Sequence, residues 1–272
     1  MPDDQYSIEA RSLRVAGVAS HDYWVLRGPD GKDMAELHGL ATDRETNRAI
    51  PIGTDEKKHS LRVWHYVHDK EFAAEHGVKP TRETYIQEGQ QHHTVLSGSK
   101  EDVLGRWNAA VAAKEPLNAL DLNYPKYGFK VFSDTVNSNS AYRTLGEVMG
   151  VPVKDFGGVI EPGLDNRMTT PEEIEKLRNK DYPVLSSREP VAPREPEQGQ
   201  LAQTDAGPAT GAGALLAGAR DGEAALGTAM RELQASAQGQ EFAARAQAQA
   251  QAQTVADAGR EPDAAQQAAA RS

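Results

Sequence analysis

The 272-residue sequence contains no cysteine, and this absence removes several chemistries at once. Disulfide bonds, thiolate metal sites and a cysteine nucleophile are all excluded. A chain without thiols also behaves alike in reducing and oxidising compartments, so cysteine usage does not indicate where the protein works. Long apolar runs are missing as well. No stretch of about 18 apolar residues occurs, so we expect no membrane span.

An excess of positive charge is also missing, because the formal net charge of the chain is −10. No basic patch stands out in the sequence, so we expect no nucleic-acid partner. The first residues, "MPDDQYSIEARS", are acidic and polar. They lack the apolar core of a Sec-type signal peptide.

Aromatic residues are nearly absent from the last third of the chain. All three tryptophans and all eight histidines lie before residue 110, and the only aromatic residue after Tyr182 is Phe242. Residues 186–200 are rich in proline and charge, as in linkers. Residues 201–272 are rich in alanine and glutamine, with too few large apolar side chains to build a core. We therefore predict one domain at residues 8–185, a linker, and a low-complexity C-terminal tail that is partly helical or disordered.

Alternating hydrophobicity predicts a β-hairpin near the start of the chain. Strand-like patterns lie on either side of "GPDG", residues 28–31. Proline at the first central position of a turn, followed by aspartate and glycine, favours a tight reversal. We therefore expect paired strands at Leu13–Arg27 and Asp33–Leu40. Further strands are predicted at Ser60–His68, at "ETYIQ" (residues 83–87) and at "HHTVLSG" (residues 92–98).

Capping signals predict helices between and after these strands. Ser99 stands three residues before Asp102 at the start of an apolar stripe, which predicts a helix at Ser99–Lys114 with Pro116 beyond its end. A second helix is expected at Ser140–Met149, ended by Gly150. Shorter helices are predicted at residues 69–78 and after Thr170, where Pro171 takes the first helical position. The expected fold class is α+β, an antiparallel sheet packed against helices.

The stretch "VNSNSAYRTLGEVMG", residues 136–150, places two serines at the expected start of the second helix. Unpaired backbone N–H groups and the positive end of the helix dipole stabilise a developing anion there. Ser138 and Ser140 are therefore candidate nucleophiles, and the backbone near Asn137, Asn139 and Ser140 is a candidate oxyanion site. Simple helix capping by serine and asparagine explains the same residues.

A serine nucleophile needs a base, and the predicted hairpin supplies candidates. His21 opens the first strand and His38 ends the returning strand, so antiparallel pairing brings both to the same end of the ladder. Two such histidines can form a general base and the group that orients it. Two unrelated polar residues at strand ends are the alternative.

The remaining histidines suggest a metal site only weakly. Four of them lie close together among acidic residues, and three nitrogen or oxygen ligands can bind zinc: His59, His65, His68 and His76. However, no His-Glu-x-x-His pattern is present, and His65 and His68 point to opposite faces of a strand. The P-loop spacing is also missing from "SGSKE", residues 97–101. We expect neither a metal nor a cofactor.

The order "HDYWVL…MAELHG", then "NSNSAYRTL" about 100 residues later, resembles the circularly permuted papain-like hydrolases. These include the lecithin–retinol acyltransferase-like enzymes and their bacterial relatives. The family has a histidine opening one strand, a polar residue on the next, and an Asn-Cys motif at a later helix N-terminus. His21, His38 and Ser138 match these positions. The resemblance, over residues 13–150, implies ester or amide hydrolysis in which Ser138 attacks, His21 is base then acid, and His38 orients His21.

The sequence departs from this family at the nucleophile, where serine replaces cysteine. Tyr142 also lies one residue later than the aromatic residue of the motif. A thiol attacks as thiolate, whereas a serine must lose its proton to a base during attack. Three outcomes stay open: a serine hydrolase, a nucleophile shifted to Ser140, or a catalytically inactive binding or adaptor protein. A structural or phage-associated component is a further alternative.

A second resemblance concerns the biological setting. "NSNS", followed by "EPGLDNRM" at Glu161–Met168, is similar to bacterial secreted or phage-associated proteins. It implies an exported effector or toxin, held in the bacterial cytoplasm before export and then secreted or delivered to a target cell. The substrates so implied are lipid esters or peptidoglycan amides. A secretion machinery or an immunity protein is the expected partner.

Overall fold

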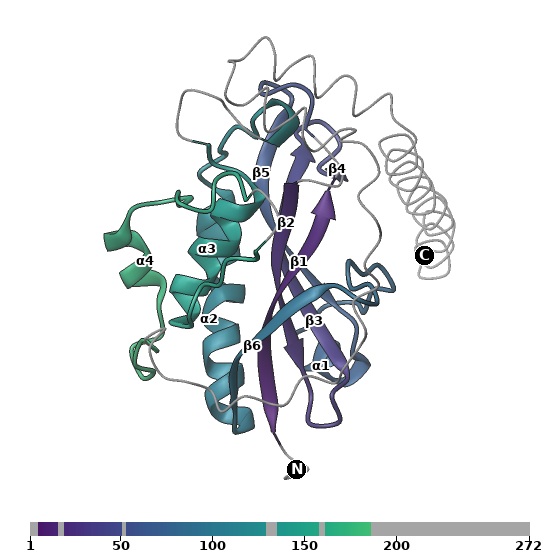
Figure 1. Cartoon of the computed structure of the whole chain (residues 1–272), viewed down its shortest axis with the longest axis vertical. Coiled ribbons are helices and arrows are strands. Elements are labelled where there is room, and N and C mark those ends of the chain that lie inside the picture. Colours follow the sequence, from purple (N-terminus) through teal and green to yellow (C-terminus); the bar gives the residue numbers. More distant parts are fainter. Residues whose placement is uncertain (1–4, 16–18, 51–52, 129–134, 158–160, 186–272) are drawn as a thin grey trace, which may run out of the picture. The chain divides into compact units, whose positions relative to one another are not determined.

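The computed structural model describes residues 5–15, 19–50, 53–128, 135–157 and 161–185 (Figure 1). The predicted linker at 186–200 and the tail at 201–272 lie outside these residues. The described part has the expected α+β character: an antiparallel sheet of six strands with a few helices. No helix within it is long and apolar enough to cross a membrane.

The sheet is built around three long neighbouring strands. These are β1 (Tyr6–Val15), β2 (Ala19–Arg27) and β3 (Asp33–Asp43). The strands follow one another across the sheet in the order β4-β3-β2-β1-β6. Strand β5 is off this path and pairs with β3. The outer strands are β4 (Ala49–Ile50), β5 (His59–Val67) and β6 (Gln91–Gly98).

The β2–β3 hairpin forms across the predicted turn, where the Gly31 N–H donates to the Gly28 carbonyl. The paired residues run from Arg27–Asp33 only as far as Trp24–Leu37. Beyond that point β3 pairs with β4 on the same edge, at Ala41 and Thr42. The two long strands of the hairpin therefore separate just where His21 and His38 lie.

The two faces of the sheet differ in chemistry, because successive side chains of a strand point to opposite sides. The helix face carries apolar side chains, among them Trp24, Leu26, Leu37, Leu61 and Val63. The polar face carries titratable and aromatic side chains, among them His21, Tyr23, Glu36, His38 and Tyr66. Residues 81–90, here called the cover segment, bond to this polar face through Thr84 and Tyr85.

Two helices cover the helix face, as Figure 1 shows. Helix α2 (Lys100–Asn118) begins at the predicted cap, where the Ser99 hydroxyl accepts from the Asp102 N–H. Helix α3 (Ser138–Met149) buries one flank against β2 and β3 and ends at Gly150, which has a left-handed backbone (φ 65°). The indole of Trp24 stacks on Tyr142 at 4.5 Å and donates to its carbonyl. Burying such apolar surface is the main driving force that docks these helices.

Short elements complete the described fold. Helix α1 (Lys70–Glu75) is capped by Asp69, and helix α4 (Pro171–Leu177) has the predicted Thr170 cap. A 3₁₀ turn lies at Lys126–Gly128. Helix α4 confirms the capping signal at Thr170, whereas α1 is shorter than the helix predicted at residues 69–78.

Several predicted boundaries were wrong. The single strand expected at Leu13–Arg27 is two strands, since Leu13–Val15 belong to β1 and pair with the start of β2. Helix α2 continues through Pro116, because the next residue, Leu117, is buried in the core. Helix α3 starts two residues earlier than predicted, with Asn137 as its cap.

The strand predicted at residues 83–87 is absent, since this part of the described chain is irregular. Its polar backbone groups bond to side chains and not to a neighbouring strand. The Tyr85 N–H donates to the Glu36 carboxylate, and the Tyr85 carbonyl accepts from the Tyr23 hydroxyl. Satisfied in this way, the segment needs no sheet partner.

Candidate functional site

The histidines of the hairpin meet on the polar face. Nε2 of His21 lies 3.0 Å from Nδ1 of His38, a hydrogen-bond distance, and the two rings are nearly parallel, at 7°. Both side chains are buried. The strand ends predicted to coincide therefore do bring a histidine pair together, at the place where β2 and β3 separate.

Glu36 extends this pair, and the sequence analysis missed it. Its carboxylate is fully buried and accepts four hydrogen bonds. Two come from histidine rings, His38 Nε2 at 2.9 Å and His68 Nε2 at 2.6 Å. The other two come from the cover segment, Thr84 Oγ1 at 2.6 Å and the Tyr85 N–H at 3.1 Å. The sequence signal was the spacing Glu-x-His, because residues two apart on a strand share a face.

Tyrosine rings enclose the histidine pair. Tyr23 stacks on His38 with ring centroids 4.5 Å apart, and Tyr85 lies over the same imidazole at 4.5 Å. Tyr66 approaches from β5 at 5.6 Å. The Tyr23 hydroxyl is itself held by Gln90 of the cover segment. Such packing leaves the imidazoles little freedom to rotate.

Burial and the Glu36 carboxylate determine the charge states of His21, His38 and Glu36. Burial lowers the pKa of His21 to about 3, and His38 adds to the effect. Burial likewise lowers the pKa of His38, against the attraction of Glu36. Burial alone would raise the pKa of Glu36, but hydrogen bonds from His38, His68 and Thr84 outweigh it and hold the pKa well below its usual range. At neutral pH the carboxylate is ionised and both His21 and His38 are neutral.

His68 is the last member of the hydrogen-bonded series that runs from His21 through His38 and Glu36. Partial burial lowers its pKa, but the hydrogen bond and the charge of Glu36 outweigh this and raise the pKa above the ordinary histidine value. Its other ring nitrogen, Nδ1, lies 3.3 Å from the Thr81 carbonyl. His68 thus favours the charged form, and it pairs with Glu36 as an ion pair.

Ser138 is the first residue of α3 and lies close to β3. A Cβ added at Gly39 would come within 3.3 Å of the Ser138 Cα and 2.2 Å of the Ala141 Cβ. Gly39 directly follows His38 but faces α3, and its missing side chain lets the start of α3 pack closely against β3. Among the described residues, no hydrogen bond joins Ser138 to a histidine ring. Burial raises the pKa of Tyr124, and hydrogen bonds with Ser138 oppose that rise.

Ser140 has a structural position. Its buried hydroxyl donates to the Gly163 carbonyl at 2.7 Å and to the Thr135 carbonyl at 3.2 Å, and it accepts from the Asn137 N–H. These contacts belong to a capping box at the start of α3. A hydroxyl bonded on all sides is poorly placed to attack a substrate.

The oxyanion donors expected at Asn139 and Ser140 are already occupied. Both N–H groups point at Oδ1 of Asn137, at 2.9 Å and 3.4 Å. The same cap that explains the sequence pattern therefore takes the donors that were assigned to an oxyanion. The Ser138 N–H does not bond to Asn137, and both the backbone and the side chain of Ser138 form hydrogen bonds with the Tyr124 side chain.

Asn139 also has a role that differs from the expected one. Its Oδ1 accepts from the Asp22 N–H at 3.0 Å, and its Nδ2 donates to the Ser20 carbonyl at 3.2 Å. These backbone groups flank His21 on the β2 edge that β3 has left. Asn139 thus takes the place of a strand partner and fixes α3 beside His21.

The other histidines have separate partners. His59 accepts from the Thr54 N–H, His65 lies beside Trp107, and His76 bonds to Asn108. No cluster of three or more His, Asp or Glu side chains suited to a metal ion occurs among the described residues.

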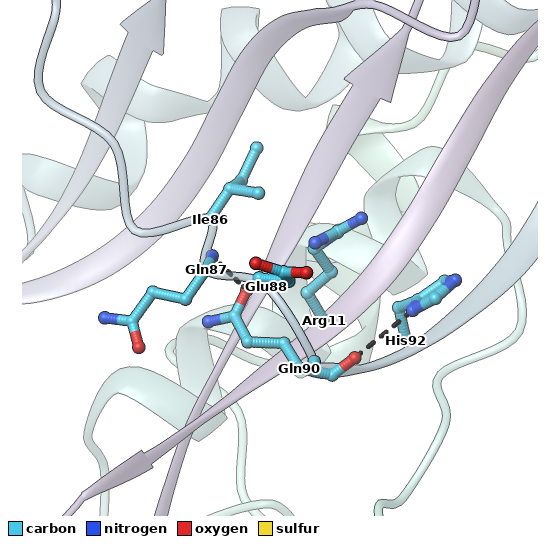
Figure 2. Close-up of a pocket in the computed structure, with 7 residues that line it drawn as sticks. Arg11, Ile86, Gln87, Glu88, Gln90 and His92 are labelled. Atoms are coloured by element: carbon cyan, nitrogen blue, oxygen red, sulfur yellow. Dashed lines mark hydrogen bonds between the residues drawn. The ribbon is translucent and has the colours of Figure 1, made fainter. Parts of the chain in front are cut away.

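A pocket of about 370 Å³ opens beside the polar face, and Figure 2 shows its lining side chains. Arg11 is the cross-strand neighbour of Tyr23, and Gln90 accepts the Tyr23 hydroxyl bond. The pocket is therefore next to the ring that stacks on His21 at 5.8 Å. Its lining is polar apart from one isoleucine: Arg11, Ile86, Gln87, Glu88, Gly89, Gln90 and His92.

Comparison with known proteins adds no relatives to this picture. The chain matches no protein-family model, no curated protein and no solved structure. The site is therefore interpreted from its own geometry.

Proposed function

We propose that this protein is a serine-dependent hydrolase that cleaves an ester or amide bond. The observation that carries the proposal is the buried hydrogen bond of 3.0 Å between His21 and His38, with Glu36 on the far side of His38. A neutral histidine held by a second polar group is the arrangement that a general base requires. The permuted papain-like fold is part of the same proposal.

In the proposed reaction, Ser138 Oγ attacks the substrate carbonyl while His21 accepts the hydroxyl proton. The tetrahedral intermediate collapses as His21 returns that proton to the leaving group, which gives an acyl-serine. Water then repeats the sequence and releases the acid. The Ser138 N–H, which bonds to the Tyr124 side chain in the free protein, is the proposed oxyanion donor in place of the two N–H groups that cap α3. Catalytic hydrogen bonds are often long before substrate binds, so Ser138 and His21 are expected to close on each other in the complex.

The pocket favours a polar substrate. Arg11, Glu88 and two glutamines offer both donors and acceptors beside Tyr23, the ring that stacks on His21, whereas an acyl chain is better held by apolar walls. Of the two substrate classes considered, we therefore propose a peptidoglycan-type amide over a lipid ester. The proposed setting is a bacterial exported effector or toxin with a secretion or immunity partner, supported by the Ala/Gln-rich composition of residues 201–272.

The test is covalent labelling of the full chain by a fluorophosphonate probe, which reacts only with an activated serine. We expect labelling of the wild-type protein, none of Ser138→Ala, and retained labelling of Ser140→Ala. His21→Gln should slow labelling by about 10²- to 10⁴-fold, the usual contribution of a general base. Labelling that survives Ser138→Ala but is lost in a folded Ser140→Ala variant would transfer the nucleophile to Ser140. Peptide amides and acyl esters, tested in parallel, separate the two substrate classes.

A binding or adaptor protein on the same fold is the second candidate. It is favoured by the two capped N–H groups and by a Ser138 hydroxyl without a histidine partner among the described residues. This candidate predicts no labelling of any variant and no turnover of either substrate class. Saturable binding of an uncleaved muropeptide to the wild-type protein would then replace the hydrolase proposal.

A further inference from the structure

We propose that Glu36 is a positioning residue that, through His38, places the ring proton of His21 on Nε2 and leaves Nδ1 as the basic nitrogen. The inference concerns which atom of His21 is basic, and its catalytic consequence rests on the proposed hydrolase function. The ring-proton assignment itself can be tested without any substrate.

The ionised carboxylate of Glu36 has no proton to donate. His38 Nε2, at 2.9 Å from Glu36 Oε2, must therefore carry the hydrogen of that bond. A neutral imidazole has one N–H, so His38 Nδ1 keeps its lone pair. The contact of 3.0 Å to His21 Nε2 is then a hydrogen bond only if His21 donates it. In the neutral His21 ring, Nδ1 is left unprotonated.

The surroundings of Glu36 keep it a pure acceptor. Its four hydrogen-bond partners all present donors, two from imidazoles, one from a hydroxyl and one from the backbone. The titratable groups that interact with it come from every packed element: Tyr23 on β2, His38 on β3, Tyr66 on β5, His68 after β5, and Tyr85 in the cover segment. His68 is the cationic partner among them, and it balances the charge of the buried carboxylate.

The cover segment takes part in the same arrangement. Thr84 and Tyr85 supply two of the four donors, and the Tyr85 ring lies over His38. Tyr85 donates to the same oxygen, Oε2, that accepts from His38. A glutamine at position 36 would therefore place its carbonyl oxygen toward His38. In the other orientation its NH₂ group would face the Tyr85 N–H, and two donors would oppose each other. An apolar residue of similar size, methionine, offers no acceptor at all.

The direct experiment is ¹⁵N NMR of the imidazole rings in the full chain at neutral pH, which distinguishes protonated from unprotonated nitrogens. We expect wild-type His21 to be protonated at Nε2 only, and Glu36→Gln to keep that state. In Glu36→Met we expect a mixture of the two forms or a shift to Nδ1. Glu9→Gln is the matched control, because Glu9 is a second buried glutamate of the polar face that pairs with Arg11 and Arg27 and touches no histidine. It should leave the His21 signals unchanged.

Activity is the second readout. If the hydrolase function holds, Glu36→Met should lower kcat by about 10²-fold with little change in KM, and Glu36→Gln should restore most of it. A His21 ring that carries its proton on Nδ1 in the wild type overturns the inference, even where Glu36→Met does not fold. Identical His21 signals in folded Glu36→Met overturn it as well. The expected NMR result with no hydrolysis by the wild type would contradict only the hydrolase function.

Discussion

The two faces of one sheet both bury side chains but hold them in different ways. On the helix face, Trp24, Leu26 and Leu37 pack against α2 and α3 and depend on apolar area. On the polar face, His38 and Glu36 are just as fully buried, and every polar atom of the pair has a partner. Packing tolerates small adjustments, whereas a buried hydrogen-bond network fails if one member is lost. The first face therefore stabilises the fold, and the second fixes the geometry of a site.

The largest expected difference between the faces is in the free energy of unfolding lost when a packed side chain is removed. Trp24→Ala should lower the free energy of unfolding by about 3–5 kcal/mol, because it empties a fully buried position and removes the bond to the Tyr142 carbonyl. Trp64→Ala is the control on the polar face, since that indole is only partly buried. Urea denaturation of both variants measures the contrast. Equal losses would show that the polar face contributes as much packing energy as the helix face.

A smaller loss of stability is expected at Asn139, which joins α3 to the free edge of β2. Asn139→Ala leaves the Asp22 N–H and the Ser20 carbonyl without their partner, which should cost about 1–3 kcal/mol. The helix-surface change Asn108→Ala serves as the control and should cost less than about 1 kcal/mol. Chemical denaturation gives both values. If the two variants are equally stable, Asn139 does not substitute for a strand partner.

The last effect is on the pH dependence of stability and comes from Asp22, which lies on the helix face. Burial raises its pKa to about 8, and the neighbouring Glu161 contributes to the rise. Between the ordinary aspartate pKa and about 8 the folded state holds a proton that the unfolded state has lost. Stability should therefore fall as pH rises through this window, by at most about 1.4 kcal/mol per pH unit. His21, with its lowered pKa, acts in the opposite direction, since stability falls as pH drops below the ordinary histidine pKa.

Asp22→Asn removes the first of these two dependences. Its stability relative to wild type should increase between pH 5 and pH 8, measured by urea denaturation at each pH. The surface change Asp181→Asn should show no such trend. A constant difference between Asp22→Asn and wild type across this range would mean that Asp22 is ionised in the folded protein.

Local signals predicted much of the fold, because they depend on neighbouring residues alone. The Ser99 and Thr170 caps, the Gly28–Gly31 turn and the Gly150 stop all occur as expected. The failures have tertiary causes. Burial of Leu117 carries α2 through Pro116, and side-chain bonds from Glu36 and Tyr23 hold residues 83–87 out of a sheet.

The candidate site could be predicted only in part. The hairpin was enough to predict that His21 and His38 lie close together, although the paired residues end at Trp24–Leu37 and the two rings meet beyond them. His68 was considered as a zinc ligand and instead bonds to Glu36, a contact that joins β3 to the end of β5 and depends on sheet order. The sequence also could not decide whether the residues of "NSNS" cap a helix or form a catalytic site. The structure assigns Asn137 and Ser140 to the cap, which leaves Ser138 as the serine of the pair without a capping role.

Gly39 shows how a residue without a functional group can control the position of a helix. It follows His38 directly, and even a methyl group there would collide with α3 next to Ser138. The close approach of α3 to β3 is therefore set by the absence of atoms at one position. Attempts to redesign the start of α3 have to preserve that space before they change its chemistry.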